Sequence, residues 1–224
     1  AVAITDHGNM FGVFKFFAAC KKYGIKPILG CEVYVVEDRF NKKFTRENKD
    51  KRYHQLLLAK NEIGYKNLMH IVSTGFIDGL YMDFPRVDFE LIKEYHEGII
   101  ATTCCVGGEV PQTLINKGFE EAEKVFKKWY DVFGDDYYVE LQRHQIQEFD
   151  NTGWSQEAIN QELLKLADKF KSLPIATNDS HYLDQKDFEA HDILLCLQTG
   201  KDFADPDRFK FENDQFFFKT QYQM

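Results

Sequence analysis

Side chains that could bind a metal ion stand near both ends of the chain, directly after runs that predict strands. Asp6 and His7 follow the first apolar run, and Asp179 and His181 follow the last one. In α/β folds the loops after the strands build the active site, and Asp-x-His can offer one cavity a hard oxygen and a borderline nitrogen. Gly8 lets the backbone turn sharply past His7. These positions predict a metal site, although a lone Asp-His pair is more often a helix cap or a surface pair.

Three further candidates lie between these two ends. Glu32 stands within an apolar run, where a buried carboxylate is costly unless it is paired or bound to a metal. The alternative is that Glu32 faces outward from a half-exposed strand. His54 opens a strand that continues into three leucines, and a hydrogen-bonded inward histidine is the alternative to a ligand. Cys105 lies in a glycine-rich turn where a thiolate could reach a metal, but buried and inert cysteines are more common.

Other acidic and histidine residues are weaker candidates. Glu140 and His144 flank Leu-Gln-Arg after another strand-like run and rank below the residues above. His70, His96 and His191 lie in helical patterns, which assigns them to packing or to the surface.

The elements that must position these side chains follow an alternating pattern. Short apolar runs alternate with helical patterns, which is typical of an α/β domain with parallel strands. The helical pattern at 10–23 places Phe11, Phe14, Phe17 and Ala18 on one apolar face, whereas the charged stretch 37–52 predicts an exposed loop or hairpin. Strands are expected at 1–5, 27–36, 53–59, 98–103, 137–141 and 173–177, and helices at 10–23, 61–73, 109–133 (one or two), 155–171 and 186–197.

Length and composition describe an ordinary globular protein of one large or two small domains. Of its 224 residues 44% are hydrophobic and 29% charged, and no window approaches the roughly 18 apolar residues of a membrane span. Five cysteines without CxxC spacing indicate a reducing compartment, the cytoplasm, with Cys20 and Cys196 as core residues. The net charge of -8 would repel a phosphate backbone, so nucleic acid would be bound elsewhere or through metal ions.

Several motifs occur in an order that can be compared with a known family. They are Thr-Asp-His-Gly-Asn-Met-Phe-Gly at 5–12, Gly-Ile-Lys-Pro-Ile-Leu-Gly-Cys-Glu-Val-Tyr at 24–34, Tyr-His at 53–54 through Gly-Tyr-Lys-Asn-Leu at 64–68, Cys-Val-Gly-Gly-Glu-Val at 105–110, Tyr-Val-Glu-Leu-Gln at 138–142, and the blocks 176–182 and 190–200. Together they resemble the polymerase-type PHP domain of bacterial DNA polymerase III alpha subunits. The resemblance covers nearly the whole chain, and its long second and closing blocks are specific to the alpha subunit rather than to PHP phosphatases in general.

The resemblance implies a distorted (β/α)7 barrel that holds up to three metal ions, usually zinc, with manganese or magnesium as substitutes. Its ligand positions fall on His7, Glu32, His54, Cys105, Asp179 and His181. The family's remaining ligands come from a His-x-His block on the first strand and an acidic residue shortly after it. That block should precede Ala1, so we expect an incomplete barrel with fewer ions. The expected organisation is a PHP domain at 1–200 and, at 201–224, the start of a connection to downstream polymerase domains.

Three functions follow from the resemblance. The first is a metal-dependent phosphoesterase, a 3′–5′ proofreading exonuclease or a pyrophosphate-removing enzyme, within a DNA polymerase whose partners are DNA, a proofreading subunit and the sliding clamp. The second is a non-catalytic platform that stabilises the polymerase and docks the proofreading subunit. The third is a free-standing phosphatase of small metabolites. The chain has no palm motif with metal-binding aspartates, so no residue is assigned to polymerase catalysis.

Overall fold

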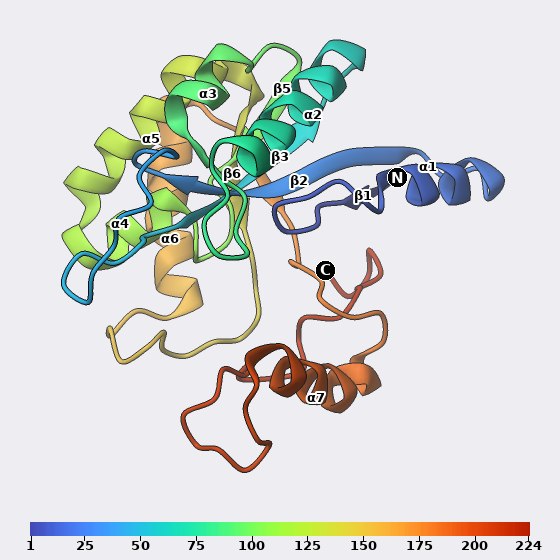
Figure 1. Ribbon diagram of the computed structural model, residues 1–224, viewed down its shortest axis with the longest axis vertical. Coiled ribbons are helices and arrows are strands. Elements are labelled where there is room, and N and C mark those ends of the chain that lie inside the picture. The colour runs from blue at the N-terminus through green and yellow to red at the C-terminus, as the bar shows by residue number, and fades with distance from the viewer.

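Strands and helices alternate in the computed structural model, which describes residues 1–224 (Figure 1). Three predicted strands, at 27–36, 53–59 and 137–141, have the bounds that the sequence indicates. The strands are β1 (Val2–Ile4), β2 (Pro27–Val36), β3 (Tyr53–Ala59), β4 (Arg86–Asp88), β5 (Ile99–Thr102), β6 (Tyr137–Leu141) and β7 (Pro174–Ala176). The helices are α1 (Val13–Lys22), α2 (Glu62–Ile77), α3 (Phe89–Glu94), α4 (Glu109–Lys117), α5 (Phe119–Phe133), α6 (Gln156–Phe170) and α7 (Phe188–Thr199), with short 3-10 turns at Gly134–Asp136 and Gln185–Asp187.

The sheet has the strand order β1-β2-β3-β5-β6-β7, and β4 pairs with β2 beside this path. The pairs β1/β2, β5/β6 and β6/β7 are parallel, as predicted, and β4 also runs parallel to β2. The prediction is wrong for β3, which runs antiparallel to both β2 and β5. The reason lies in the connection: the segment between β2 and β3 contains no helix, and an antiparallel neighbour needs no helical crossover.

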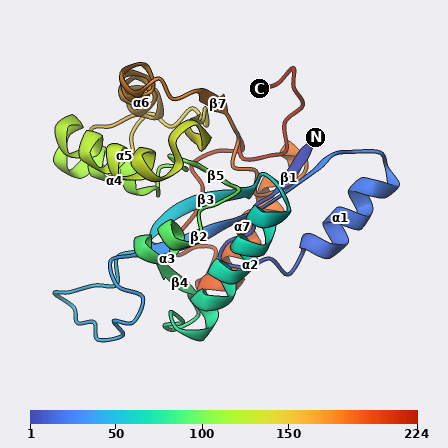
Figure 2. The same ribbon diagram turned by 90° about the horizontal axis from the view of Figure 1, so that it is seen from above.

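The sheet curls without closing, because β1 and β7 end the strand order and do not pair with each other. Helices α4, α5 and α6 lie together on one side of it, while α1 stands apart from the other helices (Figure 2). This mixed α/β architecture confirms the predicted incomplete PHP-type barrel.

The core fills the space between the sheet and its helices. Trp129 and Phe126 of α5 are fully buried, as are Leu57 of β3 and Leu68 and Ile71 of α2. The two aromatic side chains of α5 are three residues apart and therefore occupy one face of the helix. This contiguous core holds the strand ends that carry the candidate residues.

The buried Arg86 side chain binds the charged stretch 37–52, which the sequence predicts to be an exposed loop or hairpin. Arg86 of β4 has no solvent exposure, and its guanidinium donates to Asp50 Oδ1 at 2.8 Å and to the carbonyls of Gly79, Arg39 and Asn41. Both ends of the charged loop are therefore fastened to β4. Strand β4 and helix α3 were not predicted.

The apolar face predicted for the first helix is exposed in α1. Phe11 and Phe14 are 80% and 83% exposed, and the buried residues of the helix are Val13 and Cys20, of which Cys20 was predicted as a core residue. Both faces of this helix are apolar in sequence, and periodicity alone cannot choose between them.

The C-terminal quarter forms a lobe around α7 that lies beside the sheet (Figure 1). Arg208 forms a two-pronged ion pair with Asp192 of α7, at 2.5 and 2.7 Å. The chain then returns to the loop after β7, where the Phe216 carbonyl accepts a hydrogen bond from the His181 amide at 2.8 Å. None of the helices is long and apolar enough to span a membrane.

Candidate metal centre

The reversed direction of β3 places His54 at the same edge of the sheet as the other candidates. His54 lies at the start of β3, which is antiparallel to β2 and β5, so the first residues of β3 adjoin the carboxyl ends of those strands. The turn after β5 carries Cys105, and its Gly107 carbonyl accepts a hydrogen bond from the His54 amide at 3.0 Å. A Cβ atom on Gly107 would lie 3.0 Å from His54 Nδ1, so the glycine makes room for the imidazole.

Backbone pairing continues past β1 and holds His7 beside Glu32. The Gly8 amide donates to the Glu32 carbonyl at 2.8 Å, and the Glu32 amide donates to the Asp6 carbonyl at 3.1 Å. The loop after β1 is therefore fixed against the middle of β2, and His7 faces Glu32 across the pair.

The Glu32 carboxylate lies at the centre of the cluster. Its Oε1 atom is 3.0 Å from His7 Nδ1 and 2.8 Å from His54 Nδ1, and the side chain is buried. Oε1 nevertheless makes no hydrogen bond of good geometry, which is unusual for a buried oxygen. Ligand atoms of these three residues all lie within 4.8 Å of one another, close to the 3–4 Å spacing that tetrahedral zinc bonds of about 2.1 Å impose. Converging donors around an unsatisfied oxygen fit a bound cation.

The electrostatics of the cluster keep the carboxylate ionised. Burial opposes the charge of Glu32, but the adjacent imidazoles of His54 and His7 outweigh it and lower the carboxyl pKa to about 2. Burial likewise opposes the charge of His54, yet Cys105 and Glu32 raise its pKa to about 10. The pKa of His7 is raised chiefly by the adjacent Glu32 carboxylate. The cluster thus holds an anionic oxygen between two basic nitrogens.

Two adjacent thiols complete this side of the site. Cys105 Sγ lies 3.4 Å from His54 Nδ1, and Cys104, which the sequence reading missed, lies with Cys105 and Glu32 in a second group of ligand atoms within 4.8 Å of one another. A hydrogen bond with the Cys104 thiol lowers the pKa of Cys105, whereas burial raises the pKa of Cys104 well above its usual value. The sequence did contain a signal for Cys104 as a ligand, because it stands next to Cys105 directly after a predicted strand.

Asp179 and His181 come from the other end of the chain and reach the same site. The rings of His181 and His7 have centroids 6.1 Å apart, and Glu32 contributes to raising the pKa of Asp179, after the larger effect of burial. His181 Nδ1 lies 2.7 Å from the Asp179 carbonyl, which leaves Nε2 as its free nitrogen. Neither residue belongs to the two groups whose ligand atoms lie within 4.8 Å of each other. The structure brings these two residues to the edge of the cluster.

The weaker candidates have structural partners. Glu140 is buried and accepts hydrogen bonds from Thr102 and Thr177, and His144 stacks on Phe216 with its Nε2 atom 2.8 Å from the Asn178 carbonyl. His70 packs against Tyr95, His96 Nδ1 donates to the Lys93 carbonyl, and His191 packs between Tyr182 and Phe211.

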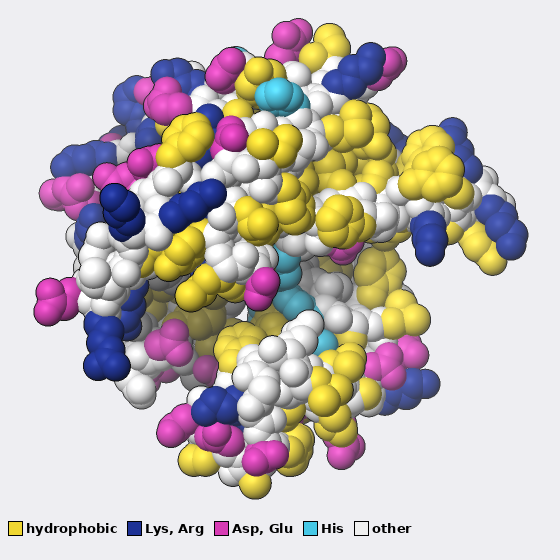
Figure 3. All heavy atoms as spheres, viewed as in Figure 1, with side chains coloured by type: hydrophobic (Ala, Val, Ile, Leu, Met, Phe, Trp, Pro, Cys, Tyr) yellow, Lys and Arg dark blue, Asp and Glu magenta, His cyan; other side chains and the backbone are white.

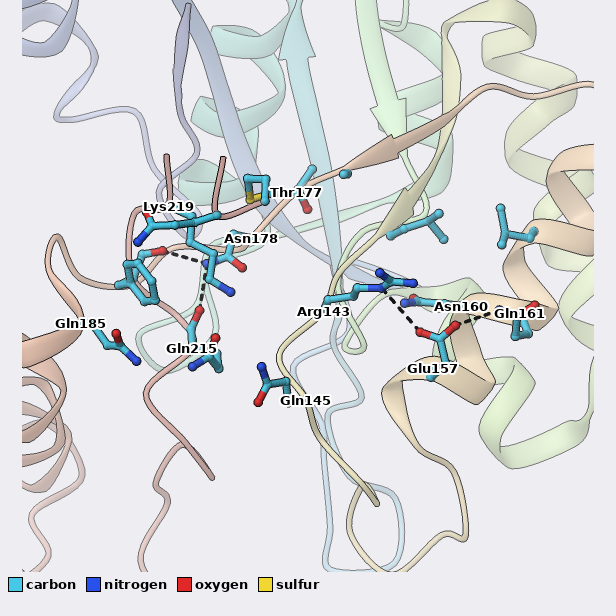
Figure 4. A pocket seen from close by; sticks show the side chains of 16 residues that line it. Arg143, Gln145, Glu157, Asn160, Gln161, Thr177, Asn178, Gln185, Gln215 and Lys219 are labelled. Atoms are coloured by element: carbon cyan, nitrogen blue, oxygen red, sulfur yellow. Dashed lines mark hydrogen bonds and ion pairs between the residues drawn. The ribbon is translucent and has the colours of Figure 1, made fainter. Parts of the chain in front are cut away.

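The candidate residues open into a groove between the sheet and the α7 lobe. Figure 3 shows histidine side chains lined up inside this groove, and ring centroids 5.1 to 6.1 Å apart connect His54, His7, His181 and His191 in that order. A separate cleft of about 590 Å³ lies beside α6, where Arg143 and Glu157 form an ion pair at 3.6 Å (Figure 4). None of the six predicted ligands lines that cleft.

The chain matches a family model and several proteins of known identity. The model of the PHP domain matches residues 1–144. The whole chain aligns with the DNA polymerase III subunit alpha of Borreliella burgdorferi at 40% identity, of Treponema pallidum at 41% and of Thermus aquaticus at 37%. It spans only 19%, 18% and 18% of the lengths of these three relatives. The chain belongs to the PHP domain family.

Proposed function

We propose that the chain is the metal-dependent phosphoesterase module of a replicative DNA polymerase III alpha subunit. Alignment of the entire chain with alpha subunits supports the parent protein, and the histidine, carboxylate and thiol cluster supports the metal-dependent module. The parent's template-directed DNA synthesis, and its partners DNA, the proofreading subunit and the sliding clamp, are part of this proposal.

The observation that carries the proposal is the buried Oε1 atom of Glu32. It has two imidazole nitrogens within 3.0 Å but no hydrogen bond of good geometry. A metal ion would satisfy it, with His7, His54 and Cys105 as co-ligands and Asp179 and His181 completing the wall. Nitrogen, oxygen and sulfur donors together favour zinc over manganese or magnesium.

The bound metal would polarise a phosphoryl oxygen and activate water for in-line attack on a phosphodiester or pyrophosphate. The chain's own contribution is to hold the ligands and to leave a path for the substrate. Glu32 keeps His7 and His54 facing one centre, and the Asp179 carbonyl fixes the ring of His181 so that Nε2 is available in the groove. Since the chain has a net charge of -8, the centre must supply the local positive potential that an anionic substrate needs.

Hydrolysis assays on the purified chain test this proposal. A single-stranded oligonucleotide and inorganic pyrophosphate are incubated separately with the chain and zinc, manganese or magnesium. We expect metal-dependent hydrolysis of one substrate, which His54→Ala abolishes and His96→Ala, on the surface, leaves unchanged. Hydrolysis that survives His54→Ala, or none with any metal, would contradict the phosphoesterase role.

A docking role is the second candidate, and exposed apolar side chains on α1 and α7 favour it. Phe11 and Phe14 at α1, and Leu194 and Leu197 on α7, are more than half exposed. Soluble domains rarely leave such patches uncovered unless they meet a partner. Size-exclusion chromatography with the proofreading subunit tests this role: co-elution that Phe14→Ser abolishes would support it, and separate elution of the unmodified chain would contradict it.

Two further assignments are part of the proposal. Since the chain spans less than a fifth of each of the three alpha subunits, a module of a longer protein is favoured over a free-standing phosphatase. We also propose that the PHP domain extends to residue 200 and that 201–224 leads toward the polymerase domains. The five cysteines, all free, support a reducing cytoplasmic setting.

A further inference from the structure

Cys104 and Cys105 form a buried pair of thiols beside the Glu32 carboxylate. They are 3% and 8% exposed, and both sulfur atoms lie within 4.8 Å of a Glu32 oxygen and of each other. Glu32 therefore belongs to two groups of donors, one with two imidazoles and one with two thiols.

The backbone turns both thiols to the same side. Successive side chains of an extended strand point to opposite faces, so neighbouring cysteines ordinarily diverge. Cys104 instead adopts a left-handed conformation with φ of 62°, and its amide donates to Thr102 Oγ1 at 3.0 Å. A Cβ atom on Gly108 would lie 3.1 Å from Cys104 Cβ, so the turn is tightly packed around this conformation.

We infer that Cys104 is a second thiolate ligand, so that Glu32, Cys104 and Cys105 together bind one metal ion. This inference rests on the proposed metal-dependent function and specifies the donors of its centre. Two thiolates and a carboxylate are three donors of the kind that suits tetrahedral zinc, and the His54 imidazole flanks them with its Nδ1 atom 3.4 Å from Cys105 Sγ. Magnesium and manganese prefer oxygen-rich surroundings, so the second thiolate selects zinc against them.

The competing explanation is that Cys104 only fills space. It packs in a small apolar cluster with Leu56 and Leu58, and a buried cysteine can act as a small hydrophobic residue. A spectroscopic count of the sulfur ligands separates the two explanations.

Cobalt replaces zinc in such sites and gives a near-ultraviolet charge-transfer band whose intensity follows the number of thiolate bonds. We would titrate the reduced, metal-free chain with Co²⁺ and compare the Cys104→Ala, Cys104→Ser and Cys105→Ser variants. Cys196→Ser is the matched control, because Cys196 is also buried but lies on α7. Circular dichroism accompanies each variant, and Cys104→Ala keeps the site apolar if serine disturbs folding.

We expect each single substitution at the pair to reduce the band by about half, as a two-thiolate centre requires, and the control to retain it. A band that depends on Cys105 but not on Cys104 would overturn this inference and leave the proposed function standing. The absence of any cobalt band in the unmodified chain would overturn the proposed metal centre as well.

Discussion

Replacing Glu32 by glutamine removes one charge from the centre of the cluster while keeping the size of the side chain. The folded protein lowers the pKa of this buried carboxyl from 4.5 to about 2. That difference corresponds to about 3 kcal/mol of stabilisation at neutral pH. The shift of His54 includes a share from Cys105, so the carboxylate is the better measure of the Glu32 interactions.

Urea unfolding in the presence of a chelator measures this contribution. Glu32→Gln should lower the free energy of unfolding by about 3 kcal/mol at pH 7. A lowered pKa contributes stability above the unfolded value of 4.5 that is lost as the pH falls toward 2, so the difference should shrink to about 2 kcal/mol at pH 3.5. Glu97→Gln, an exposed glutamate outside every ion pair, should have no effect. Equal stability of Glu32→Gln and the unmodified chain at pH 7, or a difference that grows in acid, would refute the reasoning.

Other perturbations test the fold and the limits of the chain. Arg86→Met leaves Asp50 without its buried partner, and we expect a loss of about 3–5 kcal/mol and faster proteolysis of the charged loop; unchanged cleavage would argue against the anchor. Burial lowers the pKa of His144 to about 4, so stability should fall by up to about 3 kcal/mol between pH 6.5 and pH 4, and His144→Gln should flatten that slope in urea unfolding. In Gly64→Ala the added Cβ would lie 1.7 Å from the Gly98 carbonyl oxygen, and thermal melting should show a loss of about 1–3 kcal/mol. The chain alone should not extend a primer, and template-dependent synthesis in an extension assay would contradict this.

The fold was predictable where local pattern determines it. The strand at 53–59 is a compact apolar run and appears with the predicted bounds, but its direction was predicted wrongly, because strand direction depends on the connection. Strand β4 was missed because its sequence, Arg-Val-Asp, has two charged residues and gives no apolar run, although Arg86 is buried. The sequence could not show that the Arg86 guanidinium donates hydrogen bonds to four acceptors, because three of these acceptors come from a segment distant in the chain.

The candidate site was predictable as a set of residue types, but not as a geometry. Glu32 in an apolar strand was a physical signal, and the structure accounts for it with two imidazoles within 3.0 Å. The approach of His181 to His7 joins residues from opposite ends of the chain and depends on the curl of the whole sheet. Cys104 was missed because the motif that carries the resemblance begins at Cys105, and only the left-handed backbone conformation of Cys104 in the structure shows how both thiols reach one side.

The metal content of the chain tests the central claim most directly. The purified chain would be stripped with a chelator, reloaded with zinc, desalted and analysed for zinc per chain by mass spectrometry. The account predicts tightly held zinc that is lost in both Glu32→Gln and His54→Ala and retained in His96→Ala. Zinc that is absent from the unmodified chain, or that remains equally bound in all three variants, would contradict it.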